Sequence, residues 1–137
     1  MKRTMRIIVC LMLVFTIIGS SVAYAAIESN AYISSYSGAV SINSSGTVTV
    51  NFGVWGTDKM DKLGASGISI YENGVFKKTY SWSNPLYSAS MRGEDVYHFY
   101  GSVTYDGTAG NHYQAYITFR GEKDGSGASE YLWTNTT

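Results

Sequence analysis

The chain has almost no cysteine and almost no proline. Cys10 is the only thiol and Pro85 the only proline among 137 residues. Cys10 lies in an N-terminal segment that we expect to be removed, so the remaining domain can form no internal disulfide. Small secreted domains often depend on disulfides for their stability. We therefore expect this domain to be held together by its hydrophobic core.

Neither sign of charge is in excess. Ten basic and ten acidic residues give a formal net charge of +0 at pH 7. Three of the basic residues lie in the N-terminal segment, and their removal would leave a net charge of −3. A weakly acidic surface attracts neither nucleic acid nor anionic lipid. We therefore exclude nucleic acid from the expected partners.

Long hydrophobic runs are absent, with one exception near the N-terminus. Lys2, Arg3 and Arg6 precede the apolar residues 7–18, and Ala23-Tyr24-Ala25 follows them. A basic head, a short apolar core and a small-x-small cleavage motif are the parts of a secretory signal peptide. The apolar run is shorter than the roughly 20 residues of a membrane-spanning helix, which favours a cleaved leader.

We therefore predict a helical signal peptide over residues 1–25 and one folded domain over residues 26–137. A domain of this length can bury about two-thirds of its surface, which is enough for one hydrophobic core. The mature protein is expected to be secreted and extracellular, with no stable membrane insertion after leader cleavage.

An alternation of apolar and polar residues runs through the mature chain, and it is clearest in residues 47–54 and 111–120. Strict alternation is typical of a β-strand with one buried and one solvated face. The core-facing positions predicted in these two strands are Val48, Val50, Phe52, Val54, Tyr113, Ala115, Ile117 and Phe119.

Asn73-Gly74 lies between two alternating segments and predicts a β-hairpin. Two registers fit the sequence. A two-residue turn would pair Ile70 with Lys77, whereas a three-residue loop with a glycine bulge would pair Ile70 with Lys78. We favour the second register because it buries more apolar surface. The core face would then be formed by Ile68, Ile70, Phe76 and Tyr80.

Residues 57–64 form the only segment with a helical pattern. Asp58 suits the N-cap position, and Met60 and Leu63 are spaced so that both would face the core. Gly64 suits the left-handed residue that often ends a helix. The sequence therefore predicts a short helical crossover here.

The rest of the mature chain follows the same strand pattern. We predict one bent strand or two short strands over residues 31–42, further strands over residues 96–105 and 129–134, and polar loops over residues 84–93 and 121–127. Together with the segments above, this makes about seven strands in an all-β domain, as in an antiparallel β-sandwich.

Ala109-Gly110-Asn111-His112-Tyr113-Gln114-Ala115 resembles the tyrosine corner of immunoglobulin-like and fibronectin type III-like domains. The resemblance implies an immunoglobulin-like β-sandwich in which Tyr113 is the structural corner residue and bonds back to the preceding loop. Ala115 stands where antibody domains carry a cysteine, so an antibody-type disulfide is not implied.

A longer stretch carries a second resemblance. Residues 46–54, the segment Gly56-Thr57-Asp58-Lys59-Met60-Asp61-Lys62-Leu63-Gly64-Ala65-Ser66 and residues 68–72 together resemble an uncharacterised family of small secreted proteins of Gram-positive bacteria. The resemblance implies an extracellular location and a β-sandwich. It supplies no activity and no site residues.

No catalytic or metal-binding constellation stands out. The only histidines, His98 and His112, are expected to lie far apart, and the adjacent Glu94 and Asp95 would point to opposite faces of a strand. No serine lies in a Gly-x-Ser-x-Gly elbow, and residues 124–130 lack the repeated acidic spacing of a calcium loop. We therefore expect no metal, no cofactor and no enzymatic activity.

Aromatic residues give the best candidates for a function. Trp55, Trp82, Tyr87, Tyr100 and Tyr116 fall at a strand end, beside a loop or at outward-facing positions. Exposed rings stack on sugars and anchor protein partners. We therefore predict a non-catalytic binding or cell-surface interaction module, whose partner is a cell-wall glycan or a protein. The alternative is a secreted effector, such as a bacteriocin-like protein or a protease inhibitor that uses the loop over residues 83–94.

Overall fold

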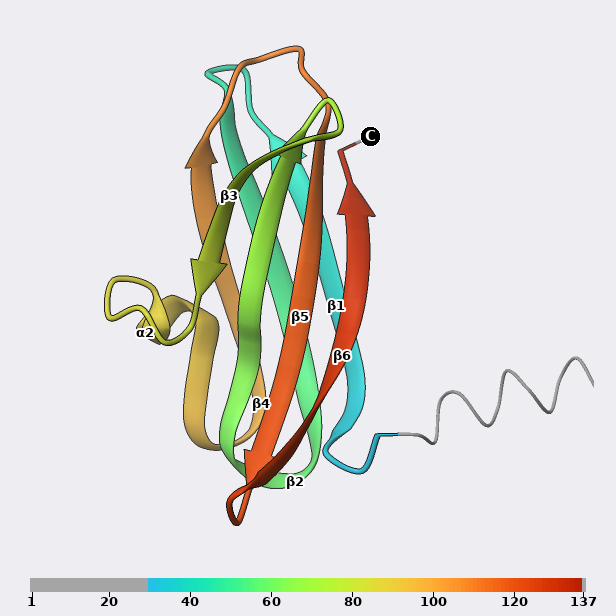
Figure 1. Cartoon of the computed structure of the whole chain (residues 1–137), viewed down its shortest axis with the longest axis vertical. Coiled ribbons are helices and arrows are strands. Elements are labelled where there is room, and N and C mark those ends of the chain that lie inside the picture. The colour runs from blue at the N-terminus through green and yellow to red at the C-terminus, as the bar shows by residue number, and fades with distance from the viewer. Residues whose placement is uncertain (1–29, 137) are drawn as a thin grey trace, which may run out of the picture. The chain divides into compact units, whose positions relative to one another are not determined.

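The computed structural model describes residues 30–136, and the predicted leader over residues 1–25 lies outside them. The described chain is almost entirely antiparallel β-structure (Figure 1), which confirms the all-β prediction. Its elements are β1 (Ile33–Ile42), β2 (Thr47–Glu72), β3 (Val75–Ser81), the short helix α2 (Ser88–Met91), β4 (Arg92–Asp106), β5 (Tyr113–Lys123) and β6 (Ser126–Asn135).

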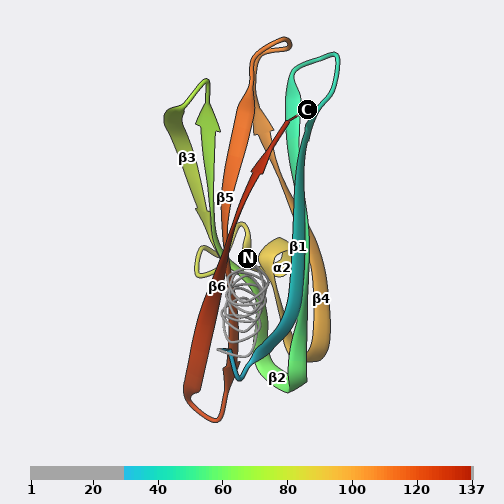
Figure 2. The ribbon, with the colours of Figure 1, turned by 90° about the vertical axis from the view of Figure 1, so that its right-hand side faces the viewer.

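The six strands form one sheet that curls around the long strand β2. The first part of β2 pairs with β1 on one side and β4 on the other. Its second part pairs with β5 and β3, and β5 pairs in turn with β6. The sheet therefore has a first layer of β1, early β2 and β4, and a second layer of β3, late β2, β5 and β6, which face each other (Figure 2).

The hydrophobic core fills the space between the two layers. All eight core positions predicted for residues 47–54 and 111–120 are buried, which confirms the alternation in both strands. The Phe119 ring of β5 lies 5.0 Å from the Tyr36 ring and 6.1 Å from the Phe52 ring, both in the first layer. Across the other side, the Tyr80 hydroxyl of β3 donates a 2.7 Å hydrogen bond to the Thr104 carbonyl of β4.

The predicted helical crossover over residues 57–64 is wrong, because β2 continues through it as a bent strand. At Leu63 the strand pairs with Gly93 of β4 on one side and Gly121 of β5 on the other. These neighbouring strands satisfy the backbone hydrogen-bonding groups of β2 on both sides, so a helix would add no further backbone hydrogen bonds. Met60 and Leu63 are buried as expected. The merging of two predicted strands into β2 also reduces the expected seven strands to six.

Asp58 and Gly64 have different roles from those predicted. The Asp58 carboxylate accepts a hydrogen bond from the backbone N–H of Lys59 and forms an ion pair with Lys123 of β5. Gly64 has no positive φ. A Cβ at this position would instead lie 2.0 Å from the carbonyl oxygen of Met91, which ends α2. The glycine is needed because another backbone crosses it closely.

The β2–β3 hairpin combines features of both registers. Ile70 pairs with Lys78 and Ile68 with Tyr80, as in the favoured register. The turn nevertheless has two residues, Asn73 and Gly74, whose φ values of 47° and 82° are those of a type I′ turn. The register of the ladder shifts between Ile70 and Tyr71, which allows the two-residue turn and the pairing of Ile70 with Lys78 to occur together.

That irregularity corrects the prediction for Phe76. Phe76 pairs with Tyr71, and Val75 pairs with Glu72. The extra residue, Lys77, reverses the side-chain alternation near the turn. Phe76 is therefore exposed, whereas Ile68, Ile70 and Tyr80 face the core as predicted.

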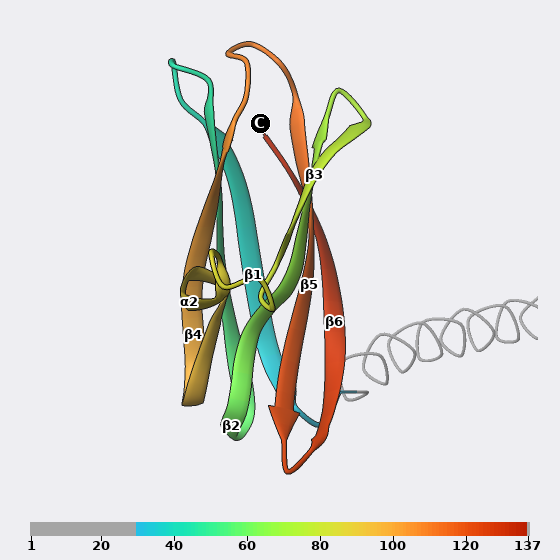
Figure 3. The same ribbon diagram turned by 60° about the vertical axis from the view of Figure 1, so that its left-hand side comes forward.

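Two predicted loops are more ordered than expected. Within residues 84–93 the chain forms α2 and the start of β4, and Figure 3 shows α2 beside β4. Residues 121–127 extend β5 and β6 up to the two-residue turn Asp124-Gly125, where both φ values are positive. Among the described residues there is no helix with the length and apolar character needed to cross a membrane.

Candidate binding surface

The five aromatic candidates from the sequence lie in three separate places. Trp55 and Tyr100 lie on the outer face of the first layer. Tyr116 lies on the outer face of the second layer. Trp82 directly follows β3 and Tyr87 directly precedes α2, so both lie in the segment of residues 82–91, which we call the α2 loop. The structure therefore does not bring them together into one site.

Trp55 and Tyr100 form a pair on neighbouring strands. Their ring centroids are 5.2 Å apart in an edge-to-face arrangement, and His98 lies 5.5 Å from the same Tyr100 ring. Gly53 makes this packing possible, because a Cβ there would lie 3.0 Å from the Tyr100 ring. Tyr100 remains 61% exposed.

Trp82 and Tyr87 instead anchor the α2 loop to the core. The Tyr87 ring lies 4.9 Å from the ring of buried Tyr80, and the Arg92 guanidinium lies 5.9 Å from the Trp82 ring. Both aromatic residues are partly buried and pack against the core. These contacts account for their position without a ligand.

Tyr116 belongs to a larger cluster that we call the aromatic face. Consecutive ring centroids lie 5.7 Å (Phe76–Tyr71), 5.2 Å (Tyr71–Trp133), 4.7 Å (Trp133–Tyr116) and 5.8 Å (Tyr116–Tyr131) apart. The face thus crosses the second layer from β3 through β2 and β5 to β6. Its five members are Tyr71, Phe76, Tyr116, Tyr131 and Trp133.

The strand registers explain why these side chains meet. Tyr71 follows the buried Ile70 and therefore points outward, and Tyr116 pairs directly with Trp133 across β5 and β6. Side chains at paired positions lie on the same face of a sheet. Phe76, Tyr131 and Trp133 are each more than half exposed, so the face is open to solvent.

Four of these five residues were missed by the sequence reasoning. Tyr131 and Trp133 alternate around Leu132, which packs against the core, so a period-two assignment of this strand would have found them. The same argument, applied from the buried Ile70, would have identified Tyr71. It would not have identified Phe76, because the orientation of that side chain depends on the irregularity at Lys77.

Tyr113 lies at a polar cluster between β5 and the loops beside it. Its ring is fully buried, and its hydroxyl accepts a 2.6 Å hydrogen bond from the backbone N–H of Thr108. The same hydroxyl donates a short hydrogen bond to Glu72 of β2, whose carboxylate also accepts from Asn111 and pairs with Lys77. The arrangement fixes the turn before β5 to the end of β2.

These contacts shift two pKa values in opposite directions. The hydrogen bond from Tyr113, together with that from Asn111, lowers the pKa of Glu72. Burial and the hydrogen bond to Glu72 raise the pKa of Tyr113. The folded state therefore favours an ionised Glu72 beside a neutral Tyr113.

The Tyr113→Phe variant should make the protein less sensitive to acid. Because Glu72 has a lowered pKa when folded, its contribution to stability is complete above its ordinary pKa of 4.5 and is lost as the pH falls through the folded pKa. Removing the hydroxyl flattens this dependence and lowers the stability near neutral pH, because Glu72 and the Thr108 N–H each lose a hydrogen-bond partner. Urea unfolding between pH 3 and pH 7 measures both effects. Tyr97→Phe, at an exposed tyrosine, is the control, and equal acid slopes in wild type and Tyr113→Phe would refute the assignment.

The structure gathers no metal site in the part of the chain that it describes. No group of three histidine, aspartate or glutamate side chains is close enough within residues 30–136 to hold a metal ion. His98 lies in β4 and His112 immediately before β5, and the two strands do not pair with each other. The Thr136 hydroxyl is a hydrogen-bonding neighbour of His112 Nδ1, at 3.3 Å.

Comparison of the chain with protein-family models, with curated proteins and with solved structures gives no match.

Proposed function

We propose that the protein is a secreted, non-catalytic binding module with an immunoglobulin-like fold, and that its aromatic face binds a polysaccharide of the cell envelope. The observation that carries the proposal is the contact of five aromatic rings across four strands, on the side of the sheet away from the core. Three of the rings are 52–56% exposed. Large exposed apolar patches on a small domain generally mark binding sites.

The chemistry of the aromatic face suits a sugar chain. Tyr116 and Tyr131 stack with an angle of 9° between their rings, and so form a compact aromatic pair. Sugar rings have apolar C–H faces that stack on aromatic rings, while tyrosine hydroxyls and the Trp133 indole N–H bond to polar groups at the rim. Gln114 and Asn135, whose amides share a 2.8 Å hydrogen bond, add further polar groups on neighbouring strands.

The inhibitor alternative has less support. An inhibitor needs a protruding and rigid loop, whereas the α2 loop is held against the domain by Tyr87 and the fully buried Met91. Leu86 is the one large apolar side chain of this loop that is strongly exposed, at 81%. A single side chain offers less contact area than the five rings of the aromatic face.

Replacing Trp133 by alanine should abolish or strongly weaken polysaccharide binding. Trp133 contacts both Tyr71 and Tyr116 at the centre of the aromatic face, and central aromatic residues carry most of the energy in binding sites. We expect a loss of affinity of about tenfold or more. Co-sedimentation of purified protein with peptidoglycan sacculi, chitin and cellulose measures it.

The controls separate binding from folding. Tyr97→Ala removes an aromatic ring of similar exposure that lies in β4, outside the aromatic face, and should leave binding unchanged. Thermal unfolding confirms that each variant is folded. Absence of wild-type binding to all three polymers would overturn the proposal and direct attention to protein partners. Equal binding by wild type and Trp133→Ala would exclude the aromatic face.

A further inference from the structure

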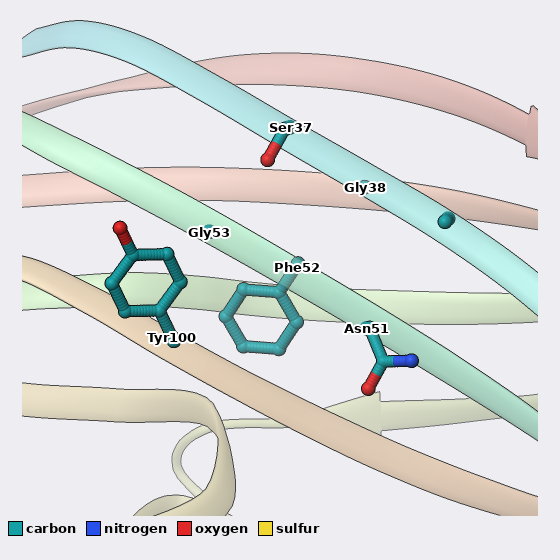
Figure 4. A pocket seen from close by; sticks show the side chains of 7 residues that line it. Ser37, Gly38, Asn51, Phe52, Gly53 and Tyr100 are labelled. Carbon is teal, nitrogen blue, oxygen red and sulfur yellow. The ribbon is translucent and has the colours of Figure 1, made fainter.

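The outer face of the first layer contains a shallow pocket that is separate from the aromatic face. It has a volume of about 310 Å³ and is formed by β1, β2 and β4 (Figure 4). Ser37, Asn51, Gly53 and Tyr100 are among its lining residues. It lies on the opposite layer of the sheet from Trp133.

One wall of the pocket is an aromatic ring held at a fixed position. Gly53 leaves room for the Tyr100 ring to lie against β2, since any Cβ there would be 3.0 Å from two ring carbons. The Trp55 ring supports Tyr100 from one neighbouring strand, and His98 supports it along β4. Tyr100 is nevertheless the most exposed aromatic residue in the described chain, at 61%. The ring is therefore held in place by its neighbours and is accessible to a ligand.

The polar groups of the pocket have no partner within the described chain. Asn51 and Ser37 are both exposed, and neither side chain forms a hydrogen bond with another group in residues 30–136. Asn51 offers two N–H donors and a carbonyl acceptor, and Ser37 offers one hydroxyl. Both are thus available to a ligand that lies beside Tyr100.

The residues around the pocket are uncharged, which indicates the class of ligand that suits it. None of its lining residues is acidic or basic. The outward positions of β1 around it are Ser35, Ser37, Ala39 and Ser41, which are also uncharged. A nucleotide, an anionic lipid or a charged peptide would find no charged partner here. Uncharged donors and acceptors beside an open aromatic ring suit a neutral ligand with hydroxyl groups.

We propose that this pocket is a second glycan-binding site, which takes one neutral sugar ring. The apolar face of the sugar stacks on Tyr100, and its hydroxyl groups exchange hydrogen bonds with Asn51 and Ser37. This inference rests on the proposal that the protein binds glycans, but it assigns a different ligand to a different layer: a single ring rather than an extended chain.

Titration of the ¹⁵N-labelled protein with soluble neutral oligosaccharides tests the pocket. The probes are chitotriose, cellotriose and maltotriose. We expect saturable chemical-shift changes at the Asn51 side-chain amide and the Gly53 N–H with at least one probe. Tyr100→Ala and Asn51→Ala should each weaken this binding by about tenfold. Ser126→Ala, at an exposed position of β6 in the other layer, is the control.

The outcomes separate this proposal from the function proposed above. Shift changes at Asn51 that persist in Trp133→Ala and disappear in Tyr100→Ala support the pocket. Changes confined to Trp133 and its neighbours would overturn the pocket and leave the aromatic face in place. No change with any of the three probes would also overturn it, while co-sedimentation reports on the aromatic face independently. Asn51→Ala removes no packed side chain, so it keeps the test valid if Tyr100→Ala unfolds.

Discussion

Replacing Gly64 by alanine is expected to destabilise the protein by about 3 kcal/mol or more. A Cβ at this position would lie 2.0 Å from the Met91 carbonyl oxygen and 2.7 Å from the Arg92 Cα. Both are backbone atoms, so no side-chain rotation can relieve the overlap. Relief requires α2 or the start of β4 to move away from β2. Overpacking a fully buried site usually costs 1–3 kcal/mol, and a backbone clash belongs at or beyond the upper end of that range.

Gly67 provides a matched control in the same strand. A Cβ there meets only the Tyr80 carbonyl, at 3.9 Å, which is an ordinary contact. Gly67→Ala should therefore change the free energy of unfolding by less than about 1 kcal/mol. Urea unfolding of the two variants measures the contrast. Similar stabilities for Gly64→Ala and Gly67→Ala would mean that α2 does not cross β2 as described.

The second large effect is expected at Phe119, whose ring links the two layers. Phe119 is fully buried and contacts the rings of Tyr36 and Phe52, both of which lie across the core from β5. Truncating a buried phenylalanine to alanine typically costs about 3–5 kcal/mol. We expect Phe119→Ala to fall in this range, since no disulfide in residues 30–136 can compensate for a lost core contact.

A conservative variant tests whether the stability lost in Phe119→Ala comes from the lost packing or from any change at this position. Phe119→Leu keeps most of the buried volume and should lose less stability than Phe119→Ala. Tyr97→Ala, which removes an exposed ring, should change the free energy of unfolding by less than about 1 kcal/mol. If Phe119→Ala lowered the free energy of unfolding by less than about 1 kcal/mol, the result would contradict the packing of the two layers against each other through this ring.

The parts of the fold that were predictable are those where one physical pattern acts alone. In residues 47–54 and 111–120, alternation with a period of two identifies the buried face, because each strand has one side on the core and one in water. Asn73-Gly74 identifies its turn because both residues tolerate a positive φ. These local rules do not depend on knowing the neighbouring strands.

The bend of β2 was not predictable from such rules. Met60 and Leu63 are three residues apart, which fits a helical turn as well as a strand whose alternation is interrupted. The decision depends on strands β4 and β5, which pair with the same few residues of β2 from both sides. Gly64 illustrates the same difficulty, because the backbone that requires a glycine there belongs to Met91.

The aromatic face was predictable in part. Tyr116 was identified from its outward position, and Tyr131 and Trp133 follow from the same alternation once β6 is placed. Phe76 depends on one extra residue in β3, which no local pattern reveals. Trp82 and Tyr87 were selected for their position near a loop, but contacts with Arg92 and Tyr80 give them a packing role.

The aromatic face and the Tyr100 pocket lie on the outer sides of the two layers, so their contributions are separable by mutation. Tyr116 and Trp133 belong to the second layer, and Asn51 and Tyr100 to the first. Residues on the outer faces of different layers, with no shared partner, generally have additive effects. Loss of one surface should therefore leave the other with its own affinity.

The most direct test of the proposed function is a binding isotherm on peptidoglycan sacculi for wild type and for the Tyr116→Ala/Trp133→Ala double variant. The two rings are in direct contact, at 4.7 Å, so the double variant removes the centre of the aromatic face without entering the core. We predict saturable binding by wild type and none by the folded double variant. Unchanged binding by the double variant, or no binding by wild type, would contradict the account.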